Sequence, residues 1–300
     1  MSDSCASSEG KQAYPWINPI GGLGDMLMVA GVLKEVVDRD TSRRFNLVRR
    51  SAYRSVFLKH PAIEAIGFPP PRSSILGTDY WRHGLDGAER RPYQTLARLF
   101  GLPTPIEEKL YYPGTAALDP LLERTVPWGK KNVVIAAGSD SPRKMMLPDR
   151  WEQLARQLVK DGFFVMQAGR LFDMQVRNAY SLLGLTGLGE LIAVIQRSDV
   201  VITVDTLAAH AARLAGTPAI VLWGPTDPAV YGHPGQRHLQ AVPFCEERDR
   251  CLSARTPHNY GKPCPFTDSR CMNRIPLEEI RAAVHETIER TSFRQAGVRK

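Results

Sequence analysis

The stretch from Asp199 to Pro228, DVVITVDTLAAHAARLAGTPAIVLWGPTDP, constrains the fold more than any other part of the chain. An apolar run, VVITV, ends at Asp205 and leads directly into the helical pattern LAAHAARLAG, which a second apolar run and a GPTDP loop follow. The pattern predicts a buried strand, a turn, a helix and a second strand. In open α/β sheets ligands bind at the carboxyl ends of the strands, and a helix that begins there attracts phosphate. The stretch therefore predicts the skeleton of a ligand site.

Similar alternation of apolar runs and helical patterns fills the rest of the chain and divides it in two. The first half begins with a short strand, a glycine turn and an amphipathic helix. FNLVRR and AIEAIGF are predicted strands on either side of a short helix, SAYRSVFLKH, and RPYQTLARLFGL is a predicted helix. The second half begins at NVVIAAG, after a stretch rich in turn formers. We predict an α/β protein with two Rossmann-like, doubly wound domains, residues 14–125 and 126–300, that face a central cleft. Residues 1–13 are polar and are predicted to be disordered.

Composition describes an ordinary soluble globular protein, with 43% hydrophobic and 23% charged residues. No apolar run approaches the ~20 residues that cross a bilayer, and the first residues lack the order of a secretory signal. We therefore expect a cytoplasmic location. A formal net charge of +8 suggests acidic partners such as phosphorylated sugars, anionic lipid headgroups or nucleic acid.

A glycine turn near the front of the first half, GGLGD, delivers Asp25 to the start of a helix. It does not match the GxGxxG dinucleotide fingerprint, which argues against a nicotinamide site. Gly22 and Gly24 would let a substrate approach the backbone closely. Asp25 has two interpretations: a first-turn carboxylate that caps the helix, or a catalytic group if the opposing domain brings an electrophile within reach.

The second half places Ser139, Arg143 and Lys144 in a loop after its first strand. Two cations beside hydroxyl groups suit a diphosphate, although a solvated basic loop would look the same. His210 lies one turn into the helix that follows Asp205, where it could reach a phosphate or ribose. The alternative for this histidine is a packed side chain on an alanine-rich helix.

Together these segments resemble glycosyltransferase family 9, the ADP-heptose heptosyltransferases that build the lipopolysaccharide inner core. The resemblance extends over nearly the whole chain, from INPIGGLGD through AAGSDSPRKMMLPDRW and residues 184–228 to CMNRIPLEEI. It implies a GT-B fold, an N-terminal domain that binds the acceptor and a C-terminal domain that binds the nucleotide sugar. It also implies inverting transfer that needs no metal or other cofactor.

The resemblance assigns roles to individual residues. Asp25 matches the proposed general base of the family, and Lys144 matches the basic residue at the donor phosphates. Asp205, Thr206 and His210 match the family pattern D-[ST]-G-x-x-H, except that Leu207 stands where the family usually has glycine. We therefore expect the donor pocket to differ at Leu207.

The remaining site residues are expected to complete the donor and acceptor halves. Gly224, Pro225 and Thr226 would line the donor side of the cleft, and Arg49 and Arg50 would meet acidic sugar or phosphate on the acceptor side. The expected donor is a nucleotide sugar linked to ADP. The expected acceptor is an anionic glycan, a lipid-linked sugar or a protein, which leaves peripheral contact with the inner membrane surface open.

Four of the five cysteines fall in one stretch as C-x5-C-x12-C-x6-C. Cys245, Cys251, Cys264 and Cys271 are wider apart than a zinc knuckle, but clustering in a cytoplasmic chain favours metal over disulfides. A structural zinc or iron and free thiols are both open. Either way, we expect residues 245–271 to form a loop-rich excursion before a final helix.

Two other classes of function stay in view. Another GT-B enzyme, such as a sugar-nucleotide epimerase, would share the paired sheets but would release nucleotide without an acceptor. A non-catalytic module held together by metal that binds anions or nucleic acid would explain the net charge. It would leave Asp25, Asp205 and the GPTDP loop unexplained, and the chain lacks the interleaved aromatic and basic residues of a single-strand groove. We expect no nucleic-acid partner.

Overall fold

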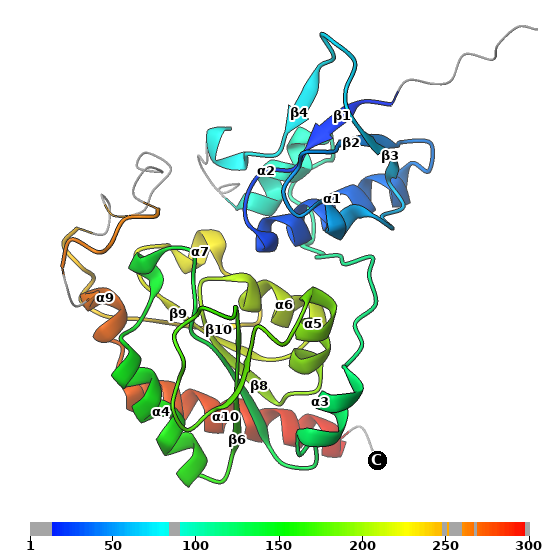
Figure 1. The fold of residues 1–300 in the computed structure, drawn as a ribbon. Coiled ribbons are helices and arrows are strands. Elements are labelled where there is room, and N and C mark those ends of the chain that lie inside the picture. The colour runs from blue at the N-terminus through cyan, green and yellow to red at the C-terminus, as the bar shows by residue number, and fades with distance from the viewer. Residues whose placement is uncertain (1–13, 84–90, 248–250, 252–259, 267–268, 298–300) are drawn as a thin grey trace, which may run out of the picture.

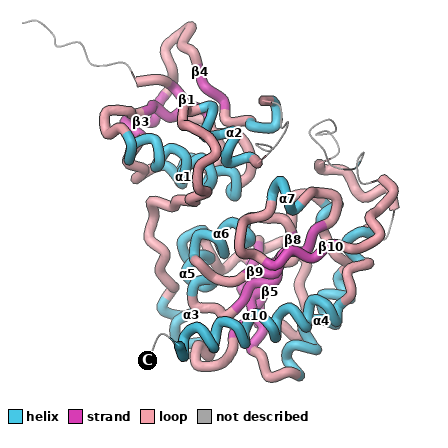
Figure 2. Tube along the Cα trace, turned by 180° about the vertical axis from the view of Figure 1, so that it is seen from behind, coloured by secondary structure: helices cyan, strands magenta, loops and turns pink. Residues whose placement is uncertain are grey.

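The computed structural model describes residues 14–83, 91–247, 251, 260–266 and 269–297, with side chains described as far as residue 291. The chain forms two lobes, one above the other in Figure 1. The extended stretch of residues 101–119 runs along one side and joins them, as the view from behind also shows (Figure 2). The predicted disorder of residues 1–13 lies outside the described residues.

The N-terminal lobe is built on a four-stranded parallel sheet in the order β3-β2-β1-β4. Its strands are β1 (Trp16–Asn18), β2 (Phe45–Val48), β3 (Ile63–Gly67) and β4 (Ile75–Gly77). Helix α1 (Leu23–Arg39) packs its apolar residues against α2 (Pro92–Leu99) and the sheet in one core. Two 3-10 turns, η1 (Arg54–Phe57) and η2 (Tyr80–Arg82), complete the lobe.

The C-terminal lobe contains a six-stranded parallel sheet in the order β10-β9-β8-β5-β6-β7. The strands are β5 (Asn132–Ala136), β6 (Phe164–Gly169), β7 (Tyr180–Leu183), β8 (Val200–Val204), β9 (Ala219–Trp223) and β10 (Arg237–Gln240). Counted along the chain from β5, this is the 3-2-1-4-5-6 arrangement of doubly wound nucleotide-binding domains.

Helices cover both faces of the larger sheet. Helix α4 (Pro148–Lys160) and helix α10 (Leu277–Gly297) pack on one face, and α5 (Leu188–Gln196) and α6 (Leu207–Ala215) pack on the other. Alternate residues of β5 point to opposite faces: Val133 and Ile135 join the first core, and Val134 joins the second. The near-continuous apolar runs of these strands follow from burial on both faces. Shorter helical segments are η4 (Pro142–Lys144), α3 (Pro120–Thr125), α7 (Pro228–Tyr231) and α9 (Arg270–Asn273).

The strand order creates one switch point in each sheet. There, the connections that leave two neighbouring strands run in opposite directions, toward opposite edges of the sheet. In the N-terminal lobe it lies between β1 and β4, and in the C-terminal lobe it lies between β5 and β8. Crevices at such points are where open α/β sheets bind ligands. The segments that follow these four strands supply Asp25, Tyr80, Lys144 and Asp205.

The structure differs from the sequence-based expectation in the less regular parts. SAYRSVFLKH was predicted to be a helix, and the structure shows only the 3-10 turn Arg54–Phe57 within it. The edge strands β4, β7 and β10 were not expected, because they are three or four residues long and lack an apolar run. Among the helices of the described residues, none is long and apolar enough to cross a membrane.

Candidate active site

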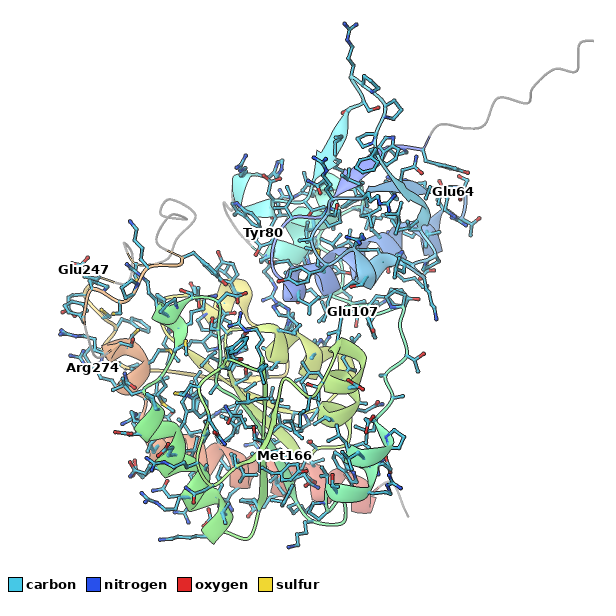
Figure 3. The ribbon with its side chains drawn as sticks, in the orientation of Figure 1. Glu64, Tyr80, Glu107, Met166, Glu247 and Arg274 are labelled. Atoms are coloured by element: carbon cyan, nitrogen blue, oxygen red, sulfur yellow. The ribbon has the colours of Figure 1, made fainter. Side chains whose placement is uncertain are left out.

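A cleft of about 970 Å³ lies between the two lobes and is lined by both. Its N-terminal wall comes from the glycine turn, η2 and the start of α2. Its C-terminal wall comes from the loops after β5, β6 and β8 and from the start of α6. In Figure 3, Tyr80 is labelled on the side of the N-terminal lobe that is turned toward the other lobe. The two switch points therefore open into one shared cavity.

Asp25 lies at the start of α1 and both of its carboxylate oxygens accept hydrogen bonds. The Gly22 amide donates to Oδ2 at 2.7 Å, and the Tyr80 hydroxyl donates to Oδ1 at 3.0 Å. The first bond is a cap of the helix start by the Asp25 side chain, which the sequence suggested as one interpretation. Burial raises the pKa of Asp25 above its usual range, against the lowering effect of both hydrogen bonds and of Lys144. The same carboxylate thus caps the helix and lines the cleft.

An ion pair between Lys144 and Asp205 faces Asp25 from the C-terminal lobe. Lys144 Nζ lies 2.7 Å from Asp205 Oδ2, and the Thr226 hydroxyl donates to the same oxygen at 2.8 Å. Burial opposes both charges, but their attraction keeps the pKa of Asp205 below and that of Lys144 above the usual range. Lys144 also lies 5.4 Å from the centre of the Tyr260 ring. The site therefore holds a fixed cation at the end of β8.

The start of α6 presents backbone to the cleft. Thr206 is the residue before the first turn, and Leu207 is the first helical residue. The backbone of Thr206 is extended, and its side chain makes no capping hydrogen bond. Both line the cleft, together with Ser139 from the loop after β5. A helix of nine residues that begins there directs its partial positive charge at the cavity.

His210 lies between the two lobes. A Cβ on Gly24 would fall 2.8 Å from its Nε2 and closer still to Cδ2, so only glycine fits at that position. Its Nδ1 lies 2.9 Å from Nε2 of His233. Burial, followed by the charge of His233, lowers the pKa of His210 to about 3. Gly22 and Gly24, expected as the acceptor side, line the cleft.

Glu108 and Arg91 extend this network into the N-terminal lobe. His233 Nδ1 lies 3.3 Å from one oxygen of the buried Glu108 carboxylate, which accepts two hydrogen bonds from Arg91. The same guanidinium donates to the carbonyls of Ala229 and Gly232 across the lobes. Burial would raise the pKa of Glu108, but the bonds from His233 and Arg91 lower it to about 2.

Five of the residues expected in the site lie elsewhere. Arg143 points away from the cleft and donates to the Lys262 carbonyl and to the carbonyl and Sγ of Cys251. Gly224 and Pro225 line a second, small cavity beside the cysteines. Arg49 and Arg50 stack 5.8 Å from the Phe68 ring and do not line the cleft.

All four clustered cysteines line that second cavity, which measures about 10 Å³. The space is comparable to a single water-sized probe. Burial raises the pKa of the Cys264 thiol, and it raises that of Cys271 to about 12. In the described part of the chain, no three histidine, cysteine, aspartate or glutamate side chains are arranged as a metal-ligand set. The donor atoms are those that zinc or iron prefers, but the arrangement is looser than a ligand set.

The two facing parallel-sheet lobes, with a carboxylate on one wall and a cation and helix start on the other, define a GT-B glycosyltransferase. The family model for glycosyltransferase family 9 (heptosyltransferase) matches residues 90–259, which is more than half of the chain. The chain therefore belongs to this family. The comparison with curated proteins finds no match.

Solved structures share the fold at low sequence identity. The iron-containing dodecameric glycosyltransferase TibC from enterotoxigenic E. coli H10407 is 16% identical, over 93% of this chain and 76% of its own, with a TM-score of 0.68. The structure of TibC in complex with ADP-D-beta-D-heptose is 16% identical over 93% of this chain and 76% of its own, with a TM-score of 0.66. The E. coli heptosyltransferase WaaC with ADP is 13% identical over 92% of this chain and 100% of its own, with a TM-score of 0.59.

Sequence reasoning missed Tyr80, Arg91, Glu108 and His233. Tyr80 comes from an irregular stretch, and its partner Asp25 is 55 positions away. Glu108 and His233 are 125 positions apart and belong to different lobes. Only their residue types could have indicated a role, because Glu108 and His233 are ionisable residues in segments that were predicted to be loops.

Proposed function

We propose that this glycosyltransferase moves a heptose from ADP-heptose to an acceptor hydroxyl, by inverting transfer without a catalytic metal and with Asp25 as the general base. One observation carries the proposal: Asp25 and the Lys144–Asp205 pair come from opposite lobes and line one cleft. The relatives whose structures hold ADP-D-beta-D-heptose and ADP support the choice of nucleotide and sugar.

Asp25 suits the removal of a proton from the acceptor. A general base works best when its pKa lies near the working pH, and burial moves the pKa of Asp25 upward from the range of an exposed carboxyl. The acceptor oxygen would attack the anomeric carbon as its proton passes to Asp25. The bond from that carbon to the β-phosphate oxygen would break, and ADP would leave with the electron pair.

The departing ADP needs positive charge that is already in place. Lys144 is held at the cleft by Asp205, and α6 begins beside it at Leu207. Fixed charges and dipoles that are aimed at developing negative charge cost no reorganisation during the reaction. Leu207, where the family usually has glycine, places a side chain at this point of the wall, and we propose that it sets the distance between the backbone and the diphosphate.

The acceptor would lie against the N-terminal lobe. That wall offers Tyr80 and Trp81 to a sugar ring. We propose a lipopolysaccharide core as the acceptor, with another glycan or a protein as the alternatives, and action at the cytoplasmic face of the membrane. The charge of +8 supports an anionic acceptor.

The test pairs transfer with donor binding. Asp25→Asn should lower the rate of transfer by at least about 100-fold, because the proton acceptor is lost. Calorimetry with ADP should show an affinity within about threefold of wild type, since Asp25 lies on the opposite wall. Loss of both would contradict the proposal and make Asp25 a structural residue.

The other classes of function give different results. An epimerase would release free nucleotide from ADP-heptose in the absence of any acceptor, and Asp25→Asn would change that release. A nucleic-acid module would bind an oligonucleotide with steep salt dependence and would gain no thermal stability from ADP. Either outcome would replace the transferase proposal.

We further propose that Cys245, Cys251, Cys264 and Cys271 hold a structural zinc or iron. Two observations support this: all four line one small cavity, and Arg143 donates a hydrogen bond to Cys251 Sγ at 3.2 Å, as suits a thiolate ligand. The iron-containing relative TibC also supports it. The metal would hold residues 245–271 in place and would take no part in the transfer.

Elemental analysis of the purified protein tests the cluster. We expect close to one zinc or iron per chain, and at least a severalfold lower content in Cys251→Ser, because a tetrathiolate site loses one ligand. Cys5→Ser, which changes the cysteine outside the cluster, is the control and should keep the wild-type content. Equal metal content in all three proteins would contradict the proposal.

A further inference from the structure

The cleft has more negative than positive groups for an enzyme whose donor carries a diphosphate. Five carboxylates line it within the described residues, against three basic side chains. These are Asp25, Glu108, Asp140, Asp173 and Asp205 against Arg91, Lys144 and Arg170. Each of the three basic groups already forms a salt bridge with one of these carboxylates. An entering diphosphate therefore needs additional positive charge.

The histidine pair beside the cleft can supply that charge. Glu108 is a carboxylate that Arg91 holds ionised, so it can only accept a hydrogen bond, and His233 Nδ1 must carry the proton between them. Only one proton fits between His233 Nε2 and His210 Nδ1, which are 2.9 Å apart. The position of that shared proton is linked to whether the remaining nitrogen, His210 Nε2, carries a proton.

Two states of the pair follow from this geometry. In the neutral state His210 Nδ1 donates to His233, and His210 Nε2 has a lone pair, which repels phosphate oxygen. In the second state a proton from solvent binds His210 Nε2, and the shared proton moves to His233 Nε2. The pair gains one proton, and the positive charge lies on His233 beside Glu108. His210, which lines the cleft next to Gly24, becomes a hydrogen-bond donor at Nε2.

We propose that binding of the donor diphosphate is coupled to uptake of one proton by the His210–His233 pair, with Glu108 stabilising the resulting charge. The proton uptake presupposes the proposed ADP-linked donor and so rests on the proposed function. Glu108 and Arg91 belong to the N-terminal lobe, and the histidines belong to the C-terminal lobe. Donor affinity consequently depends on a residue of the lobe that faces the acceptor.

The charges around the pair are consistent with a neutral resting state. His210 faces His233, Lys144, Asp205 and Glu108, and its low pKa comes from burial followed by repulsion from His233. Around His233 lie the Glu108 carboxylate with its partner Arg91, and His238, whose Nε2 is 3.2 Å from the His233 carbonyl oxygen. Arg213 donates to the Glu108 carbonyl at 3.5 Å. When a diphosphate binds, its negative charge would favour the protonated state of the pair over the neutral state.

Calorimetry with ADP in Tris and in HEPES at pH 8.0 counts the protons taken up on binding. We expect the wild-type protein to take up close to one proton more than His233→Gln or Glu108→Gln. Both variants should bind ADP about tenfold more weakly, because a charge-assisted hydrogen bond is lost. By linkage, the affinity of the wild type should fall by up to tenfold per pH unit over the pH range in which the free pair is neutral and the bound pair is protonated, and that of the variants should not.

Two controls separate the pair from its neighbours. His238→Gln changes a histidine next to His233 and should keep the wild-type uptake, and Asp25→Asn should keep it as well. Nitrogen-15 spectra of histidine-labelled protein should show His210 protonated at Nδ1 without ADP and at Nε2 with ADP.

The outcomes distinguish this inference from the proposed function. ADP binding with equal proton uptake in wild type and His233→Gln would overturn the inference alone. Loss of the uptake in Asp25→Asn would assign the proton to Asp25 and would also overturn it. Absence of any ADP binding to the wild-type protein would overturn the proposed function.

Discussion

The two oxygens of the Asp25 carboxylate show how one residue serves folding and chemistry. Oδ2 accepts from the Gly22 amide and closes the first turn of α1, which fixes the rotamer. Oδ1 accepts from Tyr80, which lies in the 3-10 turn η2 after β4, the strand that pairs with β1. Because both bonds stabilise the ionised form, they limit how far burial can raise the pKa of Asp25.

Tyr80→Phe should move the acid limb of the pH–rate profile toward higher pH. The variant loses a hydrogen bond that favours the Asp25 carboxylate, so the pKa of Asp25 rises further. A base must be deprotonated to act, and activity is therefore lost sooner as the pH falls. The profile of kcat/KM against pH measures the shift. Tyr53→Phe, at the same wall, should leave the limb in place, and an unshifted limb in Tyr80→Phe would contradict the role given to Tyr80.

Some of the site residues could be predicted from the sequence and others could not. Asp25, Lys144, Asp205 and Thr206 could be placed because each lies in a turn or loop, or at a helix start, that comes after a strand identified by the apolar pattern. Tyr80 and Glu108 could not, because they reach the site through strand order and lobe contact, which local periodicity does not encode. Arg143 was assigned to the donor with Lys144, yet a 3-10 turn directs the two side chains to different partners.

That 3-10 turn, η4, connects the donor site with the cysteine-bearing segment. Its two basic residues are neighbours in sequence, but Lys144 binds Asp205 in the cleft and Arg143 binds Cys251 on the other side. On the same side, a Cβ at Gly224 would come 2.7 Å from Met272 Sδ, so β9 and α9 pack too closely for any larger residue. The cysteine-bearing segment thus stabilises the turn that presents Lys144.

Arg143→Gln should destabilise the protein by about 2 kcal/mol, because buried hydrogen bonds from a charged group to Cys251 and Lys262 are lost. It should also weaken ADP binding, since η4 loses its anchor. Urea unfolding and calorimetry give the two quantities. Arg177→Gln removes an exposed arginine that binds Glu152 and should change neither. Weakened stability with unchanged ADP binding would show that η4 does not depend on this anchor.

Element lengths explain which parts of the fold the sequence predicted. The strands β5, β6, β8 and β9 are five or six residues long and mostly buried on both faces, so their apolar runs were readable. The edge strands β4, β7 and β10 are only partly buried and three or four residues long, which is too short for a pattern. Helix α10 was predicted because its apolar residues recur at helical spacing from Leu277.

At the scale of the whole molecule, a single buried carboxylate joins the lobes. Glu108 is bound by Arg91 from its own lobe and by His233 from the other, and Arg91 adds bonds to two carbonyls of the C-terminal lobe. The order of strands could be anticipated from doubly wound topology, but this contact could not, since it forms only when both lobes are folded and docked.

Glu108 should make stability dependent on acid pH. Its pKa falls from 4.5 to about 2 on folding, so the associated stability, about 3 kcal/mol, is present above pH 4.5 and is lost as pH falls toward 2. The urea midpoint of the wild type should therefore drop across this window more steeply than that of Glu108→Gln. The exposed neighbour Glu107 provides the matched control, and Glu107→Gln should follow the wild type. Parallel curves for all three proteins would contradict a lowered pKa at Glu108.

The close approach of Gly24 to His210 has a consequence for recombination between relatives. A hybrid enzyme that joins this N-terminal lobe to the C-terminal lobe of a relative needs glycine at position 24 wherever the other lobe has a histidine equivalent to His210. It must also inherit Glu108 together with a histidine equivalent to His233. Chimeras joined between the lobes should therefore transfer specificity only when all of these positions are exchanged together. The lobes are distinct in the fold, but their contact residues must match.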